Sequence, residues 1–350
     1  MNLRIAILNE KGSSLLLNHQ MVKTIQAVEE VFEHNFAYRE IEIAQTGTLS
    51  KTAIDLCQEA DVVFCNAKGG LKNIRAERLK EQLKLHSSTH AFQGKFTNPF
   101  ANLENQSFMD IDFLLFQELE GGVPKIDENW ESGNTRATDF YEYTEAQITR
   151  SSHSAFKASK KRGKRLTLAH YDDHMLSARL WRDVVTQVAK SYPEVELNLE
   201  HVHTTAKKLL TQPDAYDVIL SDSMFGGLLA NQSAGLMGFA EAAPNVLFGD
   251  DTVLITASPS ENNLGAENPI GAVLSVALML QTMGLHEEAT IVYDAVEKSI
   301  QEGIVTPDLK ATSPFGTEEV GDCIAEHILD WEERFIPNDE NIDLGQSTII

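Results

Sequence analysis

Histidine and aspartate side chains, which can bind metals or transfer protons, concentrate in two short stretches of this sequence. The stretches are AHYDDH at 169–174 and HVH at 201–203, and each follows or ends an apolar run of strand length. If the ends of these strands converge, imidazole nitrogens and carboxylate oxygens could form a mixed site for zinc, manganese or iron. The candidate ligands are His170, Asp172, Asp173, His174, His201 and His203.

The same stretches also have a structural interpretation, which we favour for the group as a whole. Side chains alternate along a strand, so only some of these residues could face one site. Asp172 or Asp173 could instead cap the helix predicted from Leu176 to Ser191.

A basic run, KASKKRGKR at 157–165, could bind phosphate or an acidic partner. Its position at the end of a predicted helix favours a different role, in which the cations complement the helix dipole. Gly163 is then predicted to end the helix in the left-handed conformation.

Glycine and serine motifs give weaker signals. Gly69-Gly70 and Gly121-Gly122 lack the spacing of a dinucleotide-binding or P-loop motif, and they are predicted to form turns. The segment LSDSMFGG at 220–227 lacks the GxSxG pattern of a nucleophile elbow, so a hydrolase triad is not indicated.

The composition of the chain indicates which classes of partner are unexpected and how large a core it can form. The 350 residues include 29 basic and 52 acidic side chains, a net charge of -23, and 42% are hydrophobic. The charge repels phosphate backbones and anionic lipid surfaces, so neither nucleic acid nor a membrane is an expected partner. The apolar content is sufficient for one large domain or two closely joined domains.

The N-terminus and the cysteines predict a cytoplasmic protein. MNLRIAILNE reads as a short strand, too brief for a signal peptide or a membrane span. Cys57, Cys65 and Cys323 are odd in number and widely spaced, which favours small core residues over disulfides or a zinc cluster.

Strand-like and helix-like patterns alternate along the chain and predict an α/β fold with a mostly parallel sheet flanked by helices. Strands are expected at 3–8, 60–65, 112–116, 166–169, 195–199 and 218–220, and helices at 20–33, 74–85, 142–161, 176–191 and 204–210. Residues 216–238 read as a buried strand that breaks at a turn and continues into a nearly uncharged helix.

The C-terminal part has a different character. PIGAVLSVALMLQTMGL, from Pro269, predicts a helix that is apolar on all sides and therefore buried. Amphipathic helices are expected at 286–302 and 316–335, followed by a mobile tail at 336–350.

Six segments in collinear order resemble the β-decarboxylating dehydrogenases, the family of isocitrate and isopropylmalate dehydrogenases. The segments are FANL (100–103), QELEGGV (117–123), and the stretches 160–185, 191–210, 216–238 and 268–280. The resemblance implies a two-domain α/β fold with a discontinuous large domain at 1–90 and 240–335, and a small central domain at 91–239 that supplies homodimer contacts. It also implies a cleft for a 2-hydroxy acid, NAD(P) and Mg²⁺ or Mn²⁺.

The arginines that clamp substrate carboxylates in this family are replaced. Glu104 follows FANL where the resemblance implies an arginine, and Gln117 occupies a second such position. A further arginine would fall near Gly94. An acid at 104 would repel an anionic substrate that an arginine fork should bind.

The catalytic acid and base are also replaced. The resemblance places a tyrosine at Pro124, which has no side-chain proton, and a lysine at Tyr171. The asparagine beside that lysine corresponds to Asp173.

The metal-binding aspartates correspond to His203, Gly227 and Asn231. Glycine and asparagine cannot bind a hard divalent cation as a carboxylate pair does. The resemblance therefore predicts that no metal site is retained at these three positions.

The cofactor segments diverge as well. Ser223 replaces an asparagine that lines the cofactor site, and TASPSENNLGAE at 256–267 replaces the nucleotide loop. The glycine-rich N-terminal turn becomes NEKGSSLL at 9–16, and Asn268 is the remaining cofactor-site candidate.

These replacements predict a non-catalytic homologue with a regulatory or metabolite-sensing role. Each lost group would supply on the order of 3 kcal/mol of binding or transition-state stabilisation. The expected partners are a second copy of the chain and a small carboxylate metabolite or another protein, with neither nucleotide nor metal. Two alternatives are a metalloenzyme that uses Tyr171, Asp173 and His203, and an NAD(P)-dependent oxidoreductase with another substrate.

Overall fold

The computed structural model describes residues 2–10, 15–43, 48–65, 74–100, 111–122, 139–171, 175–238, 244–257 and 266–333. The chain divides into two compact units. Unit 1 contains the described residues of Met1–Asp112 and Ser233–Ile349, and unit 2 contains those of Phe113–Gln232. The boundaries predicted from the sequence, at 91 and 239, lie outside this central segment at both ends.

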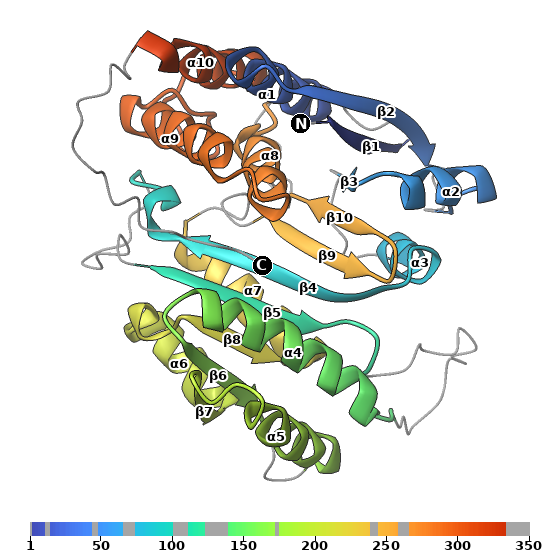
Figure 1. Cartoon of the computed structure of the whole chain (residues 1–350). Coiled ribbons are helices and arrows are strands. Elements are labelled where there is room, and N and C mark those ends of the chain that lie inside the picture. Colours follow the sequence, from blue (N-terminus) through green and yellow to red (C-terminus); the bar gives the residue numbers. More distant parts are fainter. Residues whose placement is uncertain are drawn as a thin grey trace, which may run out of the picture. The chain divides into compact units, whose positions relative to one another are not determined.

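Unit 1 contains a mixed sheet in the order β2-β1-β3-β10-β9-β4 (Figure 1). Pairing is parallel from β2 through β10, and β9 is antiparallel to both neighbours. The strands are β1 (Asn2–Glu10), β2 (Asn35–Ile43), β3 (Val62–Cys65), β4 (Leu85–Gln93), β9 (Asn245–Gly249) and β10 (Val253–Thr256).

The sequence prediction missed β2, β4, β9 and β10. Strand β2 lies at the edge of the sheet and exposes most of its side chains, so NFAYREIEI lacks a clear apolar alternation. Strand β4, LHSSTHAFQ, buries polar residues that include Ser87, Ser88 and Thr89. Hydrophobic periodicity therefore carries little signal in either strand.

The helices of unit 1 form one packed group and two shorter elements. Helix α8 contacts α1 and α9, and α10 contacts both α1 and α9. The group comprises α1 (Leu16–Phe32), α8 (Ile270–Thr282), α9 (His286–Glu302) and α10 (Thr317–Leu329), and the shorter helices are α2 (Lys51–Glu59) and α3 (Ile74–Gln82).

Helix α8 confirms the prediction of a buried apolar helix. Every residue from Ile270 to Gln281 is buried, because α8 has α1 and α9 as neighbours and also contacts β9 and β10. Helix α9 has the predicted bounds. Helix α10 is shorter than predicted and continues as a 3-10 turn at Asp330–Glu333, and the rest of the predicted helix and tail lies outside the described residues.

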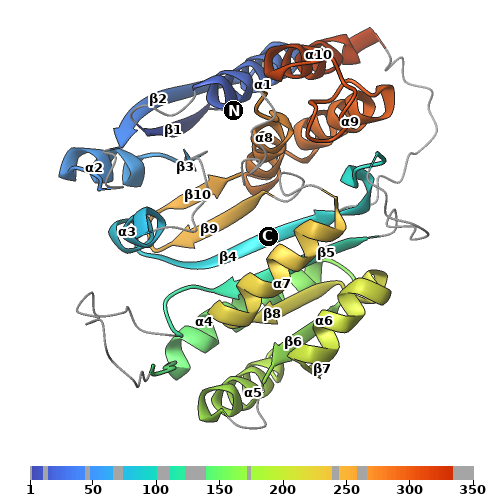
Figure 2. The ribbon, with the colours of Figure 1, turned by 180° about the vertical axis from the view of Figure 1, so that it is seen from behind.

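Unit 2 contains a parallel sheet in the order β5-β8-β6-β7. Helices α4 and α5 cover one face (Figure 1), and α6 and α7 cover the other (Figure 2). The elements are β5 (Asp112–Glu118), α4 (Glu145–Lys161), β6 (Arg165–His170), α5 (Leu176–Ala189), β7 (Glu196–His201), α6 (Val202–Thr211), β8 (Val218–Ser221) and α7 (Ser223–Leu236). Its predicted strands and helices are confirmed.

Two predicted helix boundaries are wrong. The residue in left-handed conformation after α4 is Lys164, with φ 60°, rather than Gly163. Helix α5 begins after Met175, which is the N-cap and makes no side-chain capping bond, so neither Asp172 nor Asp173 is the cap residue. Local spacing could not show where the backbone leaves each helix.

None of the described helices combines the length and the apolar character needed to cross a membrane.

Candidate functional site

The candidate site lies at the carboxyl-terminal edge of the unit 2 sheet, where all four strands end together. Gln117 on β5 is paired with Ser221 on β8, and Ala169 on β6 is also paired with Ser221. His170 on β6 is paired with His201 on β7. In parallel α/β sheets this edge is the usual place for ligand binding. Adjacent strand ends and helix starts thus position five of the candidate residues, which are Gln117, Tyr171, His203, Ser223 and Gly227.

One side of this edge is a cluster of neutral amides and glycines. Gln117 Nε2 donates a hydrogen bond to the Ser223 carbonyl oxygen at 2.6 Å. A Cβ atom at Gly227 would lie 3.1 Å from the same nitrogen, and one at Gly226 would lie 2.8 Å from Gln117 Cγ. The two glycines therefore let α7 pack against Gln117. Asn231 Nδ2 donates to the Gly227 carbonyl oxygen at 2.7 Å, one turn earlier in the helix.

The other side of the edge is a cluster of aromatic rings. Tyr171 follows β6, and its ring centroid lies 4.9 Å from His201, 5.4 Å from His203 and 5.8 Å from Phe225. The two imidazoles lie 4.7 Å apart. His201 also caps α6, since its Nδ1 accepts a hydrogen bond from the His203 backbone N–H at 3.3 Å. The strand ends that carry the two histidine stretches therefore converge, which from the sequence alone was only a condition for a metal site, and Tyr171 lies against both imidazoles.

Ser223 is held by a polar network. Its backbone N–H donates to the Tyr143 hydroxyl oxygen at 2.9 Å, and the Tyr143 hydroxyl donates to Ser223 Oγ, also at 2.9 Å. The Ser223 hydroxyl in turn donates to the Gly121 carbonyl oxygen at 3.1 Å. Gly122 has φ 106°, and a Cβ there would lie 2.2 Å from Ser223 Oγ, so the turn requires glycine. This confirms that Gly121-Gly122 forms a turn.

Asp222 is the acid next to this network and is 6% exposed. Its Oδ1 accepts a hydrogen bond from the Phe225 N–H at 2.8 Å, which caps the start of α7. Burial raises the pKa of Asp222 to about 6, although hydrogen bonds from Phe225 and Tyr141 oppose the shift. Burial also raises the pKa of Tyr143, and the nearby Asp222 carboxylate adds to that shift.

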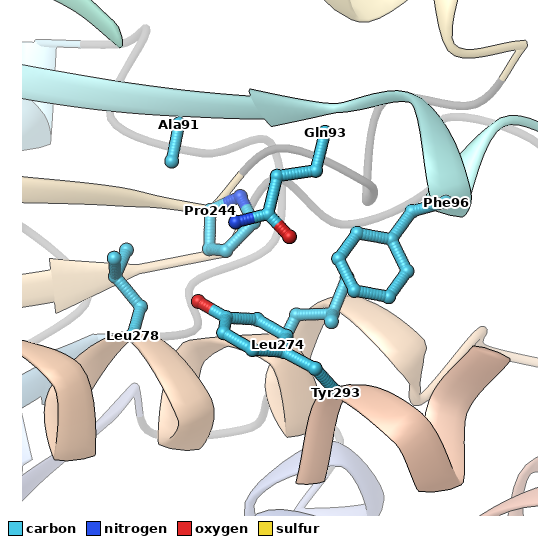
Figure 3. Close-up of a pocket in the computed structure, with 7 residues that line it drawn as sticks. All are labelled: Ala91, Gln93, Phe96, Pro244, Leu274, Leu278 and Tyr293. Carbon is cyan, nitrogen blue, oxygen red and sulfur yellow. The ribbon is translucent and has the colours of Figure 1, made fainter. Parts of the chain in front are cut away.

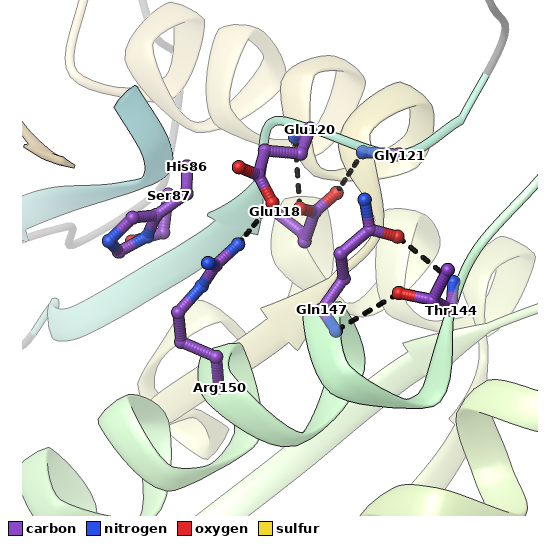
Figure 4. A network of polar contacts seen from close by, with 8 residues as sticks. All are labelled: His86, Ser87, Glu118, Glu120, Gly121, Thr144, Gln147 and Arg150. Atoms are coloured by element: carbon purple, nitrogen blue, oxygen red, sulfur yellow. Dashed lines mark hydrogen bonds and ion pairs between the residues drawn. The ribbon is translucent and has the colours of Figure 1, made fainter. Parts of the chain in front are cut away.

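A second buried acid, Glu118, ends β5 (Figure 4). It accepts hydrogen bonds from the backbone N–H groups of Glu120 at 2.9 Å and Gly121 at 2.8 Å. Burial raises the pKa of Glu118 in spite of these bonds. Arg150 of α4 pairs with Glu120, and the reciprocal Thr144–Gln147 capping box begins the same helix. Glu118 therefore fixes the turn that supports Ser223.

The basic run after α4 is partly internal. Arg162 Nε lies 3.0 Å from Asp217 Oδ1, and the two side chains are 5% and 7% exposed. Asp217 Oδ2 also accepts the Arg165 N–H at 3.2 Å. Arg162 is therefore held by a buried ion pair, whereas Lys160 and Lys161 lie in the last turn of α4, as the interpretation of the run as a helix end predicts.

Several predicted site residues lie outside the part of the chain that the structure describes. They are Glu104, Pro124 and Asp173, the proposed ligands Asp172 and His174, the pair Gly69-Gly70, and parts of the two altered cofactor segments.

Asn268, the remaining cofactor candidate, belongs to unit 1 and is 3% exposed. Its Oδ1 accepts the Ile270 N–H at 3.0 Å, and its Nδ2 donates to Asp308 Oδ2 at 3.1 Å. Both ends of the amide are thus engaged at the start of α8.

The donor set in unit 2 does not fit a divalent cation at the positions implied by the family resemblance. Gly227 offers no side chain, and Asn231 supplies one neutral amide whose nitrogen is bonded to the helix backbone. Mg²⁺ and Mn²⁺ favour charged carboxylate oxygens, and the adjacent acid Asp222 is buried as a helix cap. Among the described residues, His170, His201 and His203 do not form a group of three convergent metal ligands.

Unit 1 has a small apolar pocket (Figure 3). Its cavity volume of about 10 Å³ has room for one water molecule and excludes a hydroxy acid or a nucleotide. The lining residues are Ala91, Gln93, Phe96, Pro244, Leu274, Leu278 and Tyr293.

Sequence reasoning missed the roles of Tyr141, Tyr143 and Asp222. The only signal was the aromatic spacing of YEY at 141–143, which indicates nothing about a partner 80 residues away.

A family model, related sequences and a solved structure all indicate the same protein family. A family model described as isocitrate/isopropylmalate dehydrogenase matches residues 16–324. A protein named 3-isopropylmalate dehydrogenase from Clostridium acetobutylicum is 28% identical, with 92% of this chain and 98% of the relative covered. One of that name from Pseudomonas fluorescens is 30% identical, with 79% and 83% covered. The crystal structure of isocitrate dehydrogenase from Methylococcus capsulatus shares the fold, with a TM-score of 0.76, 22% identity, and coverage of 93% of this chain and 99% of that chain.

Proposed function

The chain belongs to the isocitrate/isopropylmalate dehydrogenase family, and we propose that it is a non-catalytic member with a regulatory or metabolite-sensing role. The family consists of oxidative decarboxylases that need a divalent metal and a nicotinamide nucleotide. The chain then retains their scaffold and uses the carboxyl-terminal edge of unit 2 to bind a small carboxylate or a protein without turnover.

The observation that carries the proposal is the neutral cluster of Gln117, Gly227 and Asn231. These residues occupy positions where the resemblance implies an arginine and two metal-binding aspartates. Their amides are hydrogen-bonded to the backbone of α7. The cluster therefore offers neither the carboxylates that hold the metal in this family nor the arginine fork that clamps the substrate for turnover.

The aromatic cluster supports the same conclusion. Tyr171 stands where the resemblance implies a catalytic lysine, and it packs against His203, which stands where a third aspartate is implied. A phenol and an imidazole in ring contact supply neither the ammonium group nor the carboxylate that those two positions have in the family.

The second candidate function is an oxidoreductase that acts on another substrate. The observation in its favour is that relatives matched over nearly their full length are named 3-isopropylmalate dehydrogenase. Tyr171 and His203 are titratable and could transfer protons if a substrate reached them. The proposed absence of metal ligands makes this the weaker candidate.

We also propose a homodimer formed through the α6 and α7 face of unit 2. Three large apolar side chains are exposed on these helices: Leu210 at 46%, Met224 at 50% and Leu228 at 59%. Met224 and Leu228 are one turn apart on α7, so they lie on the same side of the helix. Exposed apolar side chains that share a face are typical of protein interfaces.

A calorimetric titration tests the proposed absence of a metal site, with a variant that restores aspartates at two of the implied metal-binding positions. The wild-type protein is titrated with Mg²⁺, and the double variant Gly227→Asp/Asn231→Asp is titrated in parallel. A Cβ atom introduced at position 227 would meet only the flexible end of Gln117, which can move, so the variant can fold. We expect saturable Mg²⁺ binding in the variant alone. Saturable binding of Mg²⁺ to this edge in the wild type, lost in Asn231→Ala, would contradict the proposal.

A panel of 2-hydroxy acids, 2-oxo acids and dicarboxylates, titrated into the wild type, tests the sensing role. Saturable binding that is weakened by Tyr171→Ala, without product formation, supports metabolite sensing. Failure of the whole panel would refute carboxylate sensing and leave a protein ligand as the remaining form of the proposal.

A further inference from the structure

A cysteine, a histidine and a glutamate converge in unit 1, and none of the three belongs to the candidate site. Cys323 and His327 are four residues apart on α10, so both project from one side of the helix. Glu302 is the last residue of α9. The three ligand atoms lie within 4.8 Å of one another, and they form the one group of this kind among the described residues.

The two distances from His327 Nε2 fit a tetrahedral metal site. Cys323 Sγ lies 3.4 Å from His327 Nε2, which lies 3.1 Å from Glu302 Oε2. Zinc bound to thiolate, imidazole and carboxylate at ordinary bond lengths would place sulfur and nitrogen about 3.5 Å apart, and nitrogen and oxygen about 3.3 Å apart. The two distances from His327 Nε2 are thus within a few tenths of an ångström of those in a zinc site, and the third pair, Cys323 and Glu302, lies within 4.8 Å.

The helices that carry these residues are well anchored. Helix α9 packs on α8 and α10, and α10 packs on α1. Val320, Ile324 and Ile328 are fully buried on α10. The side chains of His327 and Glu302 are 12% and 40% exposed, which leaves a solvent path to the site. Rigid elements with a partly open ligand set are what a metal site requires.

We propose that Glu302, Cys323 and His327 bind a borderline-soft divalent cation, with zinc as the best match, and that the ion links the end of α9 to α10. Three protein ligands leave a fourth position for water or for another donor. This site is independent of the proposed function, because its residues belong to unit 1 and take no part in the edge of unit 2.

Lys298 competes with the metal. Its Nζ lies 3.1 Å from His327 Nδ1 and 3.7 Å from Glu302 Oε1. When Nε2 binds a metal, a neutral imidazole carries its proton on Nδ1 and can no longer accept a bond from Lys298. The lysine must then turn away, so removing it should strengthen metal binding.

The test uses the full-length protein, stripped with a chelator and titrated with Co²⁺ as a spectroscopic probe for zinc. We expect one equivalent of Co²⁺ to produce tetrahedral visible bands and a thiolate-to-cobalt charge-transfer band, both removed by one equivalent of Zn²⁺. Cys57 and Cys65 are fully buried, so neither should contribute.

Variants separate the site from adventitious binding. Cys323→Ser should abolish the charge-transfer band, and Glu302→Gln should weaken Co²⁺ binding at least tenfold. Glu302 is partly exposed, so its variant keeps the fold even if Cys323→Ser does not. Lys298→Met should bind Co²⁺ several-fold more tightly, whereas His286→Gln, an exposed histidine at the other end of α9, should bind as the wild type does.

Absence of the charge-transfer band in the wild type would overturn the proposal. Unchanged affinity in Glu302→Gln would overturn it as well, and so would a decrease in affinity equal for Glu302→Gln and His286→Gln.

Discussion

Asp222→Asn should change the pH dependence of the free energy of unfolding, and the burial of Asp222 gives both the direction and the size of the change. Asp222 is buried between β8 and α7, and burial raises its pKa from 3.8 to about 6. A shift of this size corresponds to about 3 kcal/mol between the two protonation states.

The direction in which stability changes with pH follows from proton binding. The folded protein holds the Asp222 proton more tightly than the unfolded chain does, so the contribution of this proton to stability is fully present below pH 3.8. It is lost as the pH rises through about 6. Asparagine has the same shape and can still accept the Phe225 N–H, but it is neutral at every pH. The free energy of unfolding of the variant, minus that of the wild type, should therefore rise by roughly 2.4 kcal/mol between pH 4 and pH 7, since the unfolded carboxyl group is already partly ionised at pH 4.

Urea unfolding followed by far-ultraviolet circular dichroism, at intervals between pH 4 and pH 7.5, measures this difference. Asp214→Asn, an exposed acid in the same unit, is the control and should give a nearly constant difference. A difference for Asp222→Asn that stays constant or falls with rising pH would refute the reasoning. A fall would mean that the carboxylate is stabilised as a helix cap by more than its burial costs.

Two further predictions concern an ion pair and an interface. Arg162→Met removes one partner of a buried ion pair and should lower the free energy of unfolding by about 3 kcal/mol in the same urea assay. Lys160→Met is the control and should leave the free energy of unfolding nearly unchanged, because the pairing of Lys160 with Glu194 is solvent-exposed. Leu228→Glu places a charge on the proposed α6 and α7 interface and should convert dimer to monomer in light scattering, with Leu176→Glu, which is 80% exposed and lies on α5, as the control that keeps the dimer. A wild type that is monomeric at all concentrations would contradict the dimer.

The sequence predicted the parallel sheet of unit 2 because its strands are short apolar runs bounded by helices with clear periodicity. It left open whether the strand ends that carry His170, His201 and His203 converge, because side chains alternate along a strand and spacing alone does not show which of them face one site. It could not locate β4, whose buried Ser87, Ser88 and Thr89 resemble a loop composition.

At the candidate site, the sequence could not predict contacts between residues that are distant along the chain. Tyr143 contacts Ser223, and Arg162 contacts Asp217, through chain folding that no local spacing encodes. Cys323 was predicted to be a core residue, but it is only partly buried and lies beside His327 and Glu302. Its spacing from His327 was visible in the sequence, but Glu302 lies on another helix and completes the group only in three dimensions.

A search for product distinguishes a non-catalytic protein from an enzyme. Purified wild-type protein is incubated at high concentration with NAD⁺ or NADP⁺, Mg²⁺ or Mn²⁺, and isopropylmalate or isocitrate, and the decarboxylated 2-oxo acid is measured by mass spectrometry. A relative named 3-isopropylmalate dehydrogenase serves as the positive control. We expect no product above the level of an enzyme-free incubation. Formation of product in many turnovers per protein molecule, together with reduction of the nucleotide, would contradict it.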